Sequence, residues 1–285
     1  MVHSPDKARF LALAAPGTVI PVFREIVTDL LTPLGAFVRL DRDPSEPAFL
    51  LESVEGGETW GRYSFIGIAP REIIRTRGQT VSVVAAGIEH TETVADPLTW
   101  LCARAQAWQP AGHEDLPRFF GGLVGYLGYD IVRFIEALPL SAKRDLPIWD
   151  AVLMEAGIVV ILDSLRQRAK IVCPVRVGQG ADPSALWEQA RAAIDAAVTR
   201  LRLPEPVTTP TIELDPLPPE PRANLDGPAF EAAVLKAKEY IAAGDAIQVV
   251  LSRRFEIPTG RTRPFDIYRA LRLTNPSPYM FFLRF

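Results

Sequence analysis

A proline-rich stretch over residues 201–222 (LRLPEPVTTPTIELDPLPPEPR) limits the possible folds of this 285-residue chain more than any other feature. It holds seven of the chain's 26 prolines. Proline has no amide hydrogen and a fixed φ, so neither a helix nor a central strand can run through such a stretch, and an extended spacer is favoured. We therefore expect an N-terminal domain over residues 19–177, a helix and linker over 178–225, and a second domain over 226–285.

The second domain is expected to be incomplete. Only about 60 residues follow the spacer, which is marginal for an independent hydrophobic core. The last residues, YMFFLRF from Tyr279 to Phe285, form an apolar strand pattern in which the sequence stops. A C-terminal edge strand is the alternative interpretation, but the small core favours a truncated domain.

Charge and cysteine content exclude several classes of protein. The chain has 31 basic and 34 acidic residues and a net charge of −3, so it lacks the basic surface that binds nucleic acid or a membrane. Its two cysteines, Cys102 and Cys173, make no disulfide framework, and a reducing cytoplasm is the expected compartment. The apolar run from Phe10 to Ala15 is too short for a signal peptide, and no stretch is long enough to span a bilayer.

Hydrophobic periodicity predicts a mixed chain in which short strands separated by turns form an antiparallel meander. The expected strands are 35–40, 48–54, 63–69, 72–76, 80–86, 119–129, 151–162, 169–177, 246–255 and 279–285, with a hairpin between 151–162 and 169–177. The expected helices are 19–31, 96–108, 182–201, 226–244 and 264–273, after a loose arm over residues 1–18.

The strand in LLESVEGGETWGRYSFIG (residues 50–67) carries two polar residues, Glu52 and Ser53. Because side chains alternate along a strand, Ser53 shares one face with Leu51. Glu52 lies on the opposite face, and both faces are mostly apolar. A buried polar group without a partner costs about 1–3 kcal/mol. Each of the two side chains is therefore expected to meet a protein group or a ligand.

A second polar feature is the segment NPSPYM, from Asn275 to Met280. Its prolines keep the carbonyls of Asn275 and Ser277 out of helical pairing, so these carbonyls could accept hydrogen bonds from an ammonium group. Tyr279 offers an aromatic face and Met280 a polarizable thioether. The segment would suit an amino-acid ligand, although on the residues alone a plain loop before a strand is the favoured interpretation.

Motifs for zinc, nucleotides and hydrolytic triads do not occur in the sequence. The glycines Gly121, Gly122, Gly125 and Gly128 do not match a phosphate-binding loop, and close backbone packing in a core is the favoured explanation for them.

Four segments occur in an order and at separations that resemble the N-terminal half of anthranilate synthase component I, a chorismate-utilising enzyme family. They are LLESVEGGETWGRYSFIG, FFGGLVGYLGYD, YIAAGDAIQVVLSRRF and NPSPYMFFL. The resemblance covers Val19 to Phe285 and is weakest over 178–225. It implies an α+β fold with antiparallel β-sandwich-type sheets flanked by helices. It also implies a lyase that converts chorismate and ammonia to anthranilate and pyruvate, the first step of tryptophan biosynthesis.

The same resemblance implies Mg²⁺ as cofactor, a glutamine amidotransferase subunit (component II) as the ammonia source, and allosteric feedback inhibition by L-tryptophan. Ser53, Pro278, Tyr279 and Met280 match the family's tryptophan-binding positions, and Leu51 and Glu52 flank the site. Because Glu52 points away from Ser53, we expect its carboxylate to pair with an arginine or with backbone amides of the protein rather than with the ligand.

Three further expectations follow from the resemblance. Gln248 stands where related enzymes that add water carry lysine. A glutamine side chain cannot titrate, which suits a reaction with ammonia. Gln248 could lie near the substrate, or it could be a residue of a sheet whose amide is satisfied by hydrogen bonds, and both interpretations stay open. The catalytic residues and Mg²⁺ ligands belong to the family's C-terminal half, so we expect none in this chain and no activity from it alone. Arg284 stands where the family usually has an acidic residue.

Two alternative functions stay open. Aminodeoxychorismate synthase component I shares the scaffold and makes the 4-amino product. A non-catalytic tryptophan-binding module would explain the regulatory residues without an enzyme.

Overall fold

The computed structural model describes residues 3–53, 61–139, 146–204 and 220–285. The chain divides into two compact units. Unit 1 joins Met1–Val207 with Leu271–Phe285, and unit 2 is Thr208–Ala270. The domain boundaries expected from the sequence stay predictions, and much of the proline-rich stretch lies outside the described residues.

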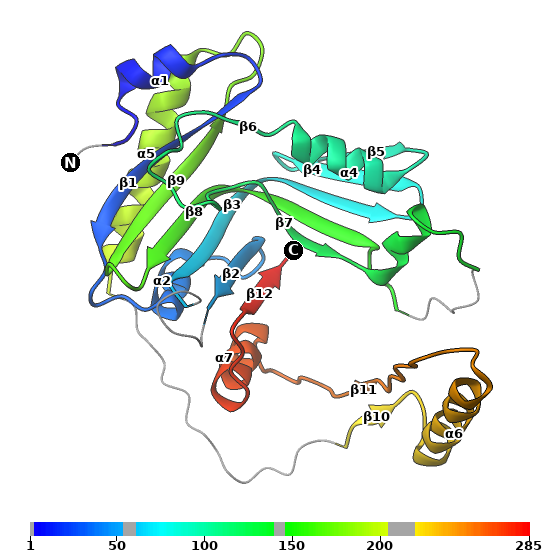
Figure 1. Cartoon of the computed structure of the whole chain (residues 1–285). Helices are drawn as coiled ribbons and strands as arrows, with labels where there is room; N and C mark the ends of the chain where they lie inside the picture. Colours follow the sequence, from blue (N-terminus) through cyan, green and yellow to red (C-terminus); the bar gives the residue numbers. More distant parts are fainter. Residues whose placement is uncertain (1–2, 54–60, 140–145, 205–219) are drawn as a thin grey trace. The chain divides into compact units, whose positions relative to one another are not determined.

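Unit 1 is built on one large, mainly antiparallel sheet (Figure 1). In the described part of the chain the main order of its strands is β12-β2-β3-β8-β9-β1-β6. β4 also pairs with β3 and with β5, and β7 pairs with β8. The bounds are β1 Thr18–Val27, β2 Ala48–Glu52, β3 Tyr63–Arg77, β4 Thr80–Ala85, β5 Ile88–Thr93, β6 Gln109–Pro110, β7 Leu123–Leu127, β8 Ala151–Asp163, β9 Arg168–Arg176 and β12 Met280–Arg284.

The two longest strands, β3 and β8, form the middle of the sheet. Two of the expected strands, 63–69 and 72–76, are one strand in the structure, with a bulge between Pro70 and Glu72. β8 turns into β9 through the polar segment 164–167, which confirms the predicted hairpin. The meander is only partly correct, because β3 pairs with the distant β8 as well as with its chain neighbours β2 and β4.

Helices α4 (Pro97–Gln106) and α5 (Pro183–Arg202) begin where their sequences predict. α5 lies against β9 and β1 (Figure 1). It buries one apolar stripe. α4 starts behind Asp96, whose side chain accepts hydrogen bonds from two backbone amides. This proline-after-cap start is the one expected from the sequence. The α+β class is thereby confirmed.

Three expectations near the N-terminus are wrong. Residues 19–31 form no helix but lie largely in the buried strand β1, which pairs with β9 over nine positions. Residues 35–40 form no strand but belong to helix α2 (Pro33–Leu40), capped by Thr32. The arm expected over residues 1–18 is not loose from residue 3 onward, because α1 (Lys7–Leu13) packs against α5 and buries Phe10 completely.

Two of the clusters of buried apolar side chains in the described part of unit 1 lie on strands that position the site. The larger one includes Phe49 of β2, Met154 of β8 and Val172 of β9, with Leu51 packed against it. The smaller one joins Ile74 of β3 with Leu101 of α4. β2 therefore contributes one face directly to the larger of these two clusters.

Unit 2 contains β10 (Arg222–Ala223), α6 (Gly227–Ala243), β11 (Phe255–Glu256) and most of α7 (Pro264–Thr274), whose last turn belongs to unit 1. Gly244 ends α6 in the left-handed conformation, as predicted. The expected strand 246–255 is wrong: only its last residue is in a strand, β11, which pairs with the two residues of β10. Ile247 and Val250 are 98% and 83% exposed, so this apolar run has no strand partner among the described residues.

None of the helices in the described ranges combines the length and hydrophobicity needed to cross a membrane.

Candidate functional site

Strands β2 and β12 bring together two segments that are distant in the sequence (Figure 1). They pair antiparallel from Met280 opposite Glu52 to Arg284 opposite Ala48. Both segments that the sequence analysis selected, LLES and NPSPYM, therefore meet at one end of this pair. The expected site residues are neighbours in space, although more than 220 positions separate them.

A hydrogen bond joins the two segments beyond the last ladder pair. The Ser53 hydroxyl donates to the Pro278 carbonyl oxygen at 2.9 Å. Pro278 is one of the residues expected to bind the ligand. The polar group of Ser53 thus has the partner that its place in an apolar strand requires.

The expected site residues divide between two faces of the sheet. Opposed residues of an antiparallel pair point to the same side, so Met280 shares its face with Glu52, and Leu51 shares the other with Phe281. Leu51 packs against the cluster that contains Phe49, and Met280 is buried. Tyr279 is 63% exposed and presents its ring outside the buried pair.

The Glu52 carboxylate has a protein partner. Its Oε2 accepts a hydrogen bond from Arg272 Nε at 3.2 Å, and the Glu52 side chain is only 2% exposed. Arg272 lies in the last turn of α7, which precedes the NPSPYM segment. The prediction that Glu52 pairs with an arginine of the protein is confirmed. The buried ion pair therefore joins Arg272, which belongs to unit 1, to the last residue of β2.

Sequence reasoning missed Arg272 as a member of this region. The signal was a buried glutamate that needs a cation, together with an arginine that precedes the proline turn by a few residues. Chain order alone did not show which of the 31 basic residues would reach Glu52.

Gln248 lies in unit 2, in a stretch without regular secondary structure, and its side chain is exposed. The satisfied-sheet interpretation of Gln248 is therefore wrong, because the strand it assumed does not form there. A role near the substrate stays a prediction.

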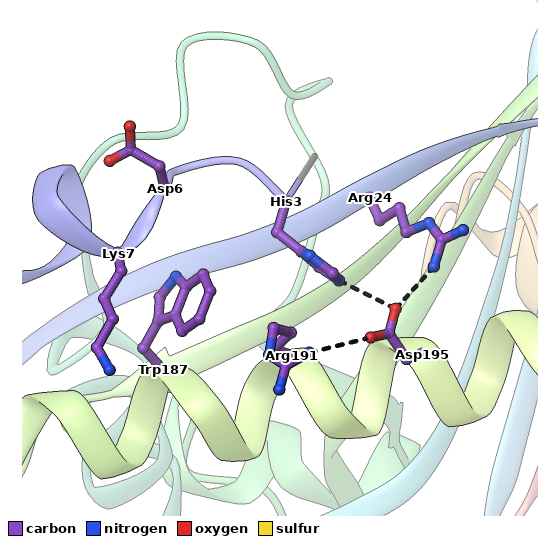
Figure 2. A pocket seen from close by; sticks show the side chains of 7 residues that line it. All are labelled: His3, Asp6, Lys7, Arg24, Trp187, Arg191 and Asp195. Carbon is purple, nitrogen blue, oxygen red and sulfur yellow. Dashed lines mark hydrogen bonds and ion pairs between the residues drawn. The ribbon is translucent and has the colours of Figure 1, made fainter. Parts of the chain in front are cut away.

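A separate pocket of about 440 Å³ lies between the N-terminal arm, β1 and α5 (Figure 2). Its charges compensate one another: Asp195 Oδ1 accepts from Arg24 Nη1 at 2.7 Å and lies 3.1 Å from His3 Nε2. Lys7 pairs with the Glu188 carboxylate at 2.9 Å. Trp187 Nε1 donates to the Pro5 carbonyl at 3.3 Å. These contacts fasten the arm to α5, and none of the expected site residues lines the pocket.

The described residues contain no group of three or more histidine, cysteine, aspartate or glutamate side chains that could hold a metal ion.

Comparison with known proteins places this geometry in a family. A family profile described as chorismate binding enzyme matches residues 46–285. The chain belongs to the chorismate binding enzyme family. The match spans β2 and β12, so both halves of the candidate site lie within the family region.

Curated relatives point to one branch of that family. The chain is 40% identical over 291 residues to "Anthranilate synthase component 1" of Pseudomonas putida, a match that covers 98% of this chain and 57% of the relative. It is also 40% identical over 269 residues to the protein of the same name from Aquifex aeolicus, covering 94% and 53%. The chain therefore spans just over half the length of these relatives.

A solved structure shows the same fold. The crystal structure of anthranilate synthase component I from Streptococcus pneumoniae TIGR4 matches with a TM-score of 0.60 and 24% identity, over 88% of this chain and 53% of that one. At this identity the likeness supports the fold alone.

Proposed function

We propose that this chain is part of an anthranilate synthase component I, which converts chorismate and ammonia to anthranilate and pyruvate as the first step of tryptophan biosynthesis. Membership of the chorismate binding enzyme family and the names of the curated relatives support the proposal. A glutamine amidotransferase subunit, component II, is the proposed source of ammonia, and the cytoplasm the proposed location.

Mg²⁺ is the proposed cofactor on the family resemblance alone. In the part of the chain that the structure describes, no group of three or more histidine, cysteine, aspartate or glutamate side chains could hold this ion.

The proposed contribution of this chain is feedback regulation by L-tryptophan. One observation carries it: Ser53 at the end of β2 donates a hydrogen bond to the carbonyl of Pro278, so the two segments expected to bind tryptophan are in contact. A ligand held between them would fix β2 relative to the turn before β12. Inhibition is allosteric if this ordering changes the affinity for chorismate, and couplings of about 1–3 kcal/mol are typical.

The regulatory proposal is tested with Ser53→Phe, which replaces a small hydroxyl by a ring that fills the space beside Pro278. We expect the 285-residue chain to bind L-tryptophan in isothermal titration calorimetry and the variant to lose that binding. Ser164→Phe, on the exposed turn of the β8–β9 hairpin, is the matched control and is expected to bind normally. Equal affinity of the Ser53 variant and the unchanged chain would refute the site.

The catalytic proposal needs a second assay. The full reading frame that encodes this chain is supplied with chorismate, Mg²⁺ and ammonium, and anthranilate fluorescence is followed with and without L-tryptophan. Fluorescence that tryptophan suppresses in the unchanged protein, but not in Ser53→Phe, supports both proposals. A 4-amino product would instead indicate aminodeoxychorismate synthase. Tryptophan binding without any product would indicate a binding module.

A further inference from the structure

Arg284, in the edge strand β12, has a guanidinium group that reaches the loop leading into β2. It forms a two-pronged ion pair with Asp41: Nη1 donates to Oδ2 at 2.8 Å and Nη2 to Oδ1. Its Nε donates to the Glu46 carbonyl at 2.8 Å, and Nη2 also to the carbonyls of Glu46 at 2.6 Å and Asp43 at 3.1 Å. One side chain therefore holds three positions of the loop.

The loop is preorganised to receive this arginine. Asp43 Oδ1 accepts hydrogen bonds from the Ser45 amide at 2.8 Å and the Ser45 hydroxyl at 2.7 Å, and the Glu46 amide donates to the Asp43 carbonyl at 3.0 Å. This tight turn presents the carbonyls of Asp43 and Glu46 to one donor. A planar guanidinium satisfies a carboxylate and two carbonyls at once, which a lysine ammonium or an acidic side chain could not.

The backbone ladder alone specifies the position of β2 weakly. β2 and β12 are five residues each, and β2 pairs with β3 at only three positions. A slip of one residue would move every side chain of β2 to the opposite face. The two arginine contacts lie at opposite ends of the pair: Arg272 holds Glu52 at the site end, and Arg284 holds the loop at the other.

We propose that Arg284 is a positioning residue of the tryptophan site proposed at Ser53 and Pro278. Its guanidinium group holds the 41–46 loop against β12 and thereby sets the register that places Ser53 beside Pro278. It acts through the backbone, since its contacts are with the loop rather than with Ser53. The inference rests on the proposed tryptophan site, but the effect of the Arg284 contacts on the pairing of β2 with β12 can be measured without tryptophan.

The test uses Arg284→Met in the 285-residue chain, which keeps an unbranched apolar stem and removes every donor. Hydrogen–deuterium exchange is followed by mass spectrometry on peptides that cover β2 and β12. We expect these amides to exchange about tenfold faster, because the loop no longer fixes the pair, while the β8–β9 hairpin is unchanged. Tryptophan affinity, measured by calorimetry, is expected to fall about tenfold.

Two control variants separate positioning from general stability. Arg284→Lys restores the charge without the planar fork and is expected to recover only part of the affinity. Arg168→Met removes an arginine whose pair with Glu25 is well exposed, and it is expected to leave both readouts unchanged. Amides of β2 and β12 that exchange as slowly in Arg284→Met as in the Arg168→Met control would overturn the inference.

The two proposals fail in different ways. Faster exchange with unchanged tryptophan affinity makes Arg284 merely structural, which overturns its positioning role and leaves the proposed function intact. If the unchanged chain binds no tryptophan, the proposed regulatory function is wrong. The role of Arg284 in positioning a tryptophan site is then wrong as well. Faster exchange together with weaker binding, in the variant only, supports both.

Discussion

Gly125 lies in β7 where there is no room for a side chain. A Cβ added there would lie 1.9 Å from the Val152 carbonyl oxygen of the paired strand β8. We therefore expect Gly125→Ala to force β7 away from β8 and to lower the free energy of unfolding by at least the roughly 1–3 kcal/mol typical of overpacking. Urea unfolding followed by circular dichroism measures the loss.

Gly178 provides the matched control for that substitution. It also belongs to unit 1, but an added Cβ would meet nothing within 4 Å. Gly178→Ala is expected to leave the midpoint of unfolding nearly unchanged. Similar midpoints for the two alanine variants would show that close packing is not the reason for glycine at position 125.

Single residues were partly predictable from the sequence. Close backbone packing was expected of the four glycines in the glycine-rich segment, and it is confirmed at Gly125 and at Gly128, where a Cβ would lie 3.0 Å from the Asp150 carbonyl oxygen. It is wrong at Gly122, where a Cβ would meet nothing within 4 Å but φ is +111°. The need of Glu52 for a cation was predictable because a buried carboxylate demands one. Its identity, Arg272, was not, because it depends on the three-dimensional path between two segments 220 positions apart.

Elements were predictable where local signals agreed. α4, α5 and α6 each begin with aspartate followed within two residues by proline, and each was expected. β1 was mistaken for a helix, because a short apolar run fits either structure until its partner is known. That partner is β9, which pairs with Pro21 and its neighbours at nine positions. α2 was mistaken for a strand although Thr32 and Pro33 supplied a helix start.

The junction of β3, β8 and β9 contains a carboxylate whose charge state matters. Asp163 ends β8 and accepts hydrogen bonds from Arg62 Nη2 at 2.7 Å and from the Arg166 amide at 3.1 Å. Burial raises the pKa of Asp163, but the hydrogen bonds from Arg62 and the loop amides outweigh burial, so the pKa lies below its ordinary value. The ionised form therefore stabilises the fold.

The sign of the pH dependence follows from this lowered pKa. The stabilisation is fully present above the unfolded pKa of about 3.9 and is lost as pH falls through the lower, folded pKa. We expect Asp163→Asn to be less stable than the unchanged chain from pH 5 to 7, and the difference to shrink below about pH 4. Urea unfolding at a series of pH values tests this.

The exposed Asp115 supplies the control for the pH series. Asp115→Asn is expected to follow the unchanged chain across the whole range. A difference between Asp163→Asn and the unchanged chain that stayed constant down to pH 2.5 would contradict the assigned role, because a protonated Asp163 should behave like asparagine.

At the scale of the whole molecule, the sequence indicated a division at the proline-rich stretch but not where the last residues belong. Residues 271–285 cluster with the N-terminal residues, because β12 pairs with β2 rather than with a strand of unit 2. Long-range strand pairing depends on shape and burial at both ends, which local periodicity does not encode. The family resemblance suggested the meeting of LLES and NPSPYM; residue patterns alone did not.

This clustering predicts that unit 1 requires its C-terminal strand β12 for stability but does not require unit 2, the segment that separates its two parts in the sequence. A chain that stops at Ala270 loses Arg272, the partner of the buried Glu52, and the buried side chains of Met280 and Phe282. Removing one partner of a buried ion pair costs about 3–5 kcal/mol, so we expect a lower unfolding midpoint and no tryptophan binding. In a second chain, a Gly/Ser linker of about 20 residues replaces residues 208–263, which keeps α7 whole and the linker flexible. Because this chain keeps both strands and both arginines, its β2–β12 exchange protection and tryptophan affinity should match those of the unchanged chain. The opposite result would be a chain ending at Ala270 that is as stable as the unchanged chain, together with a Gly/Ser-linked chain that is unfolded. That result would mean that β12 is not an integral strand of unit 1.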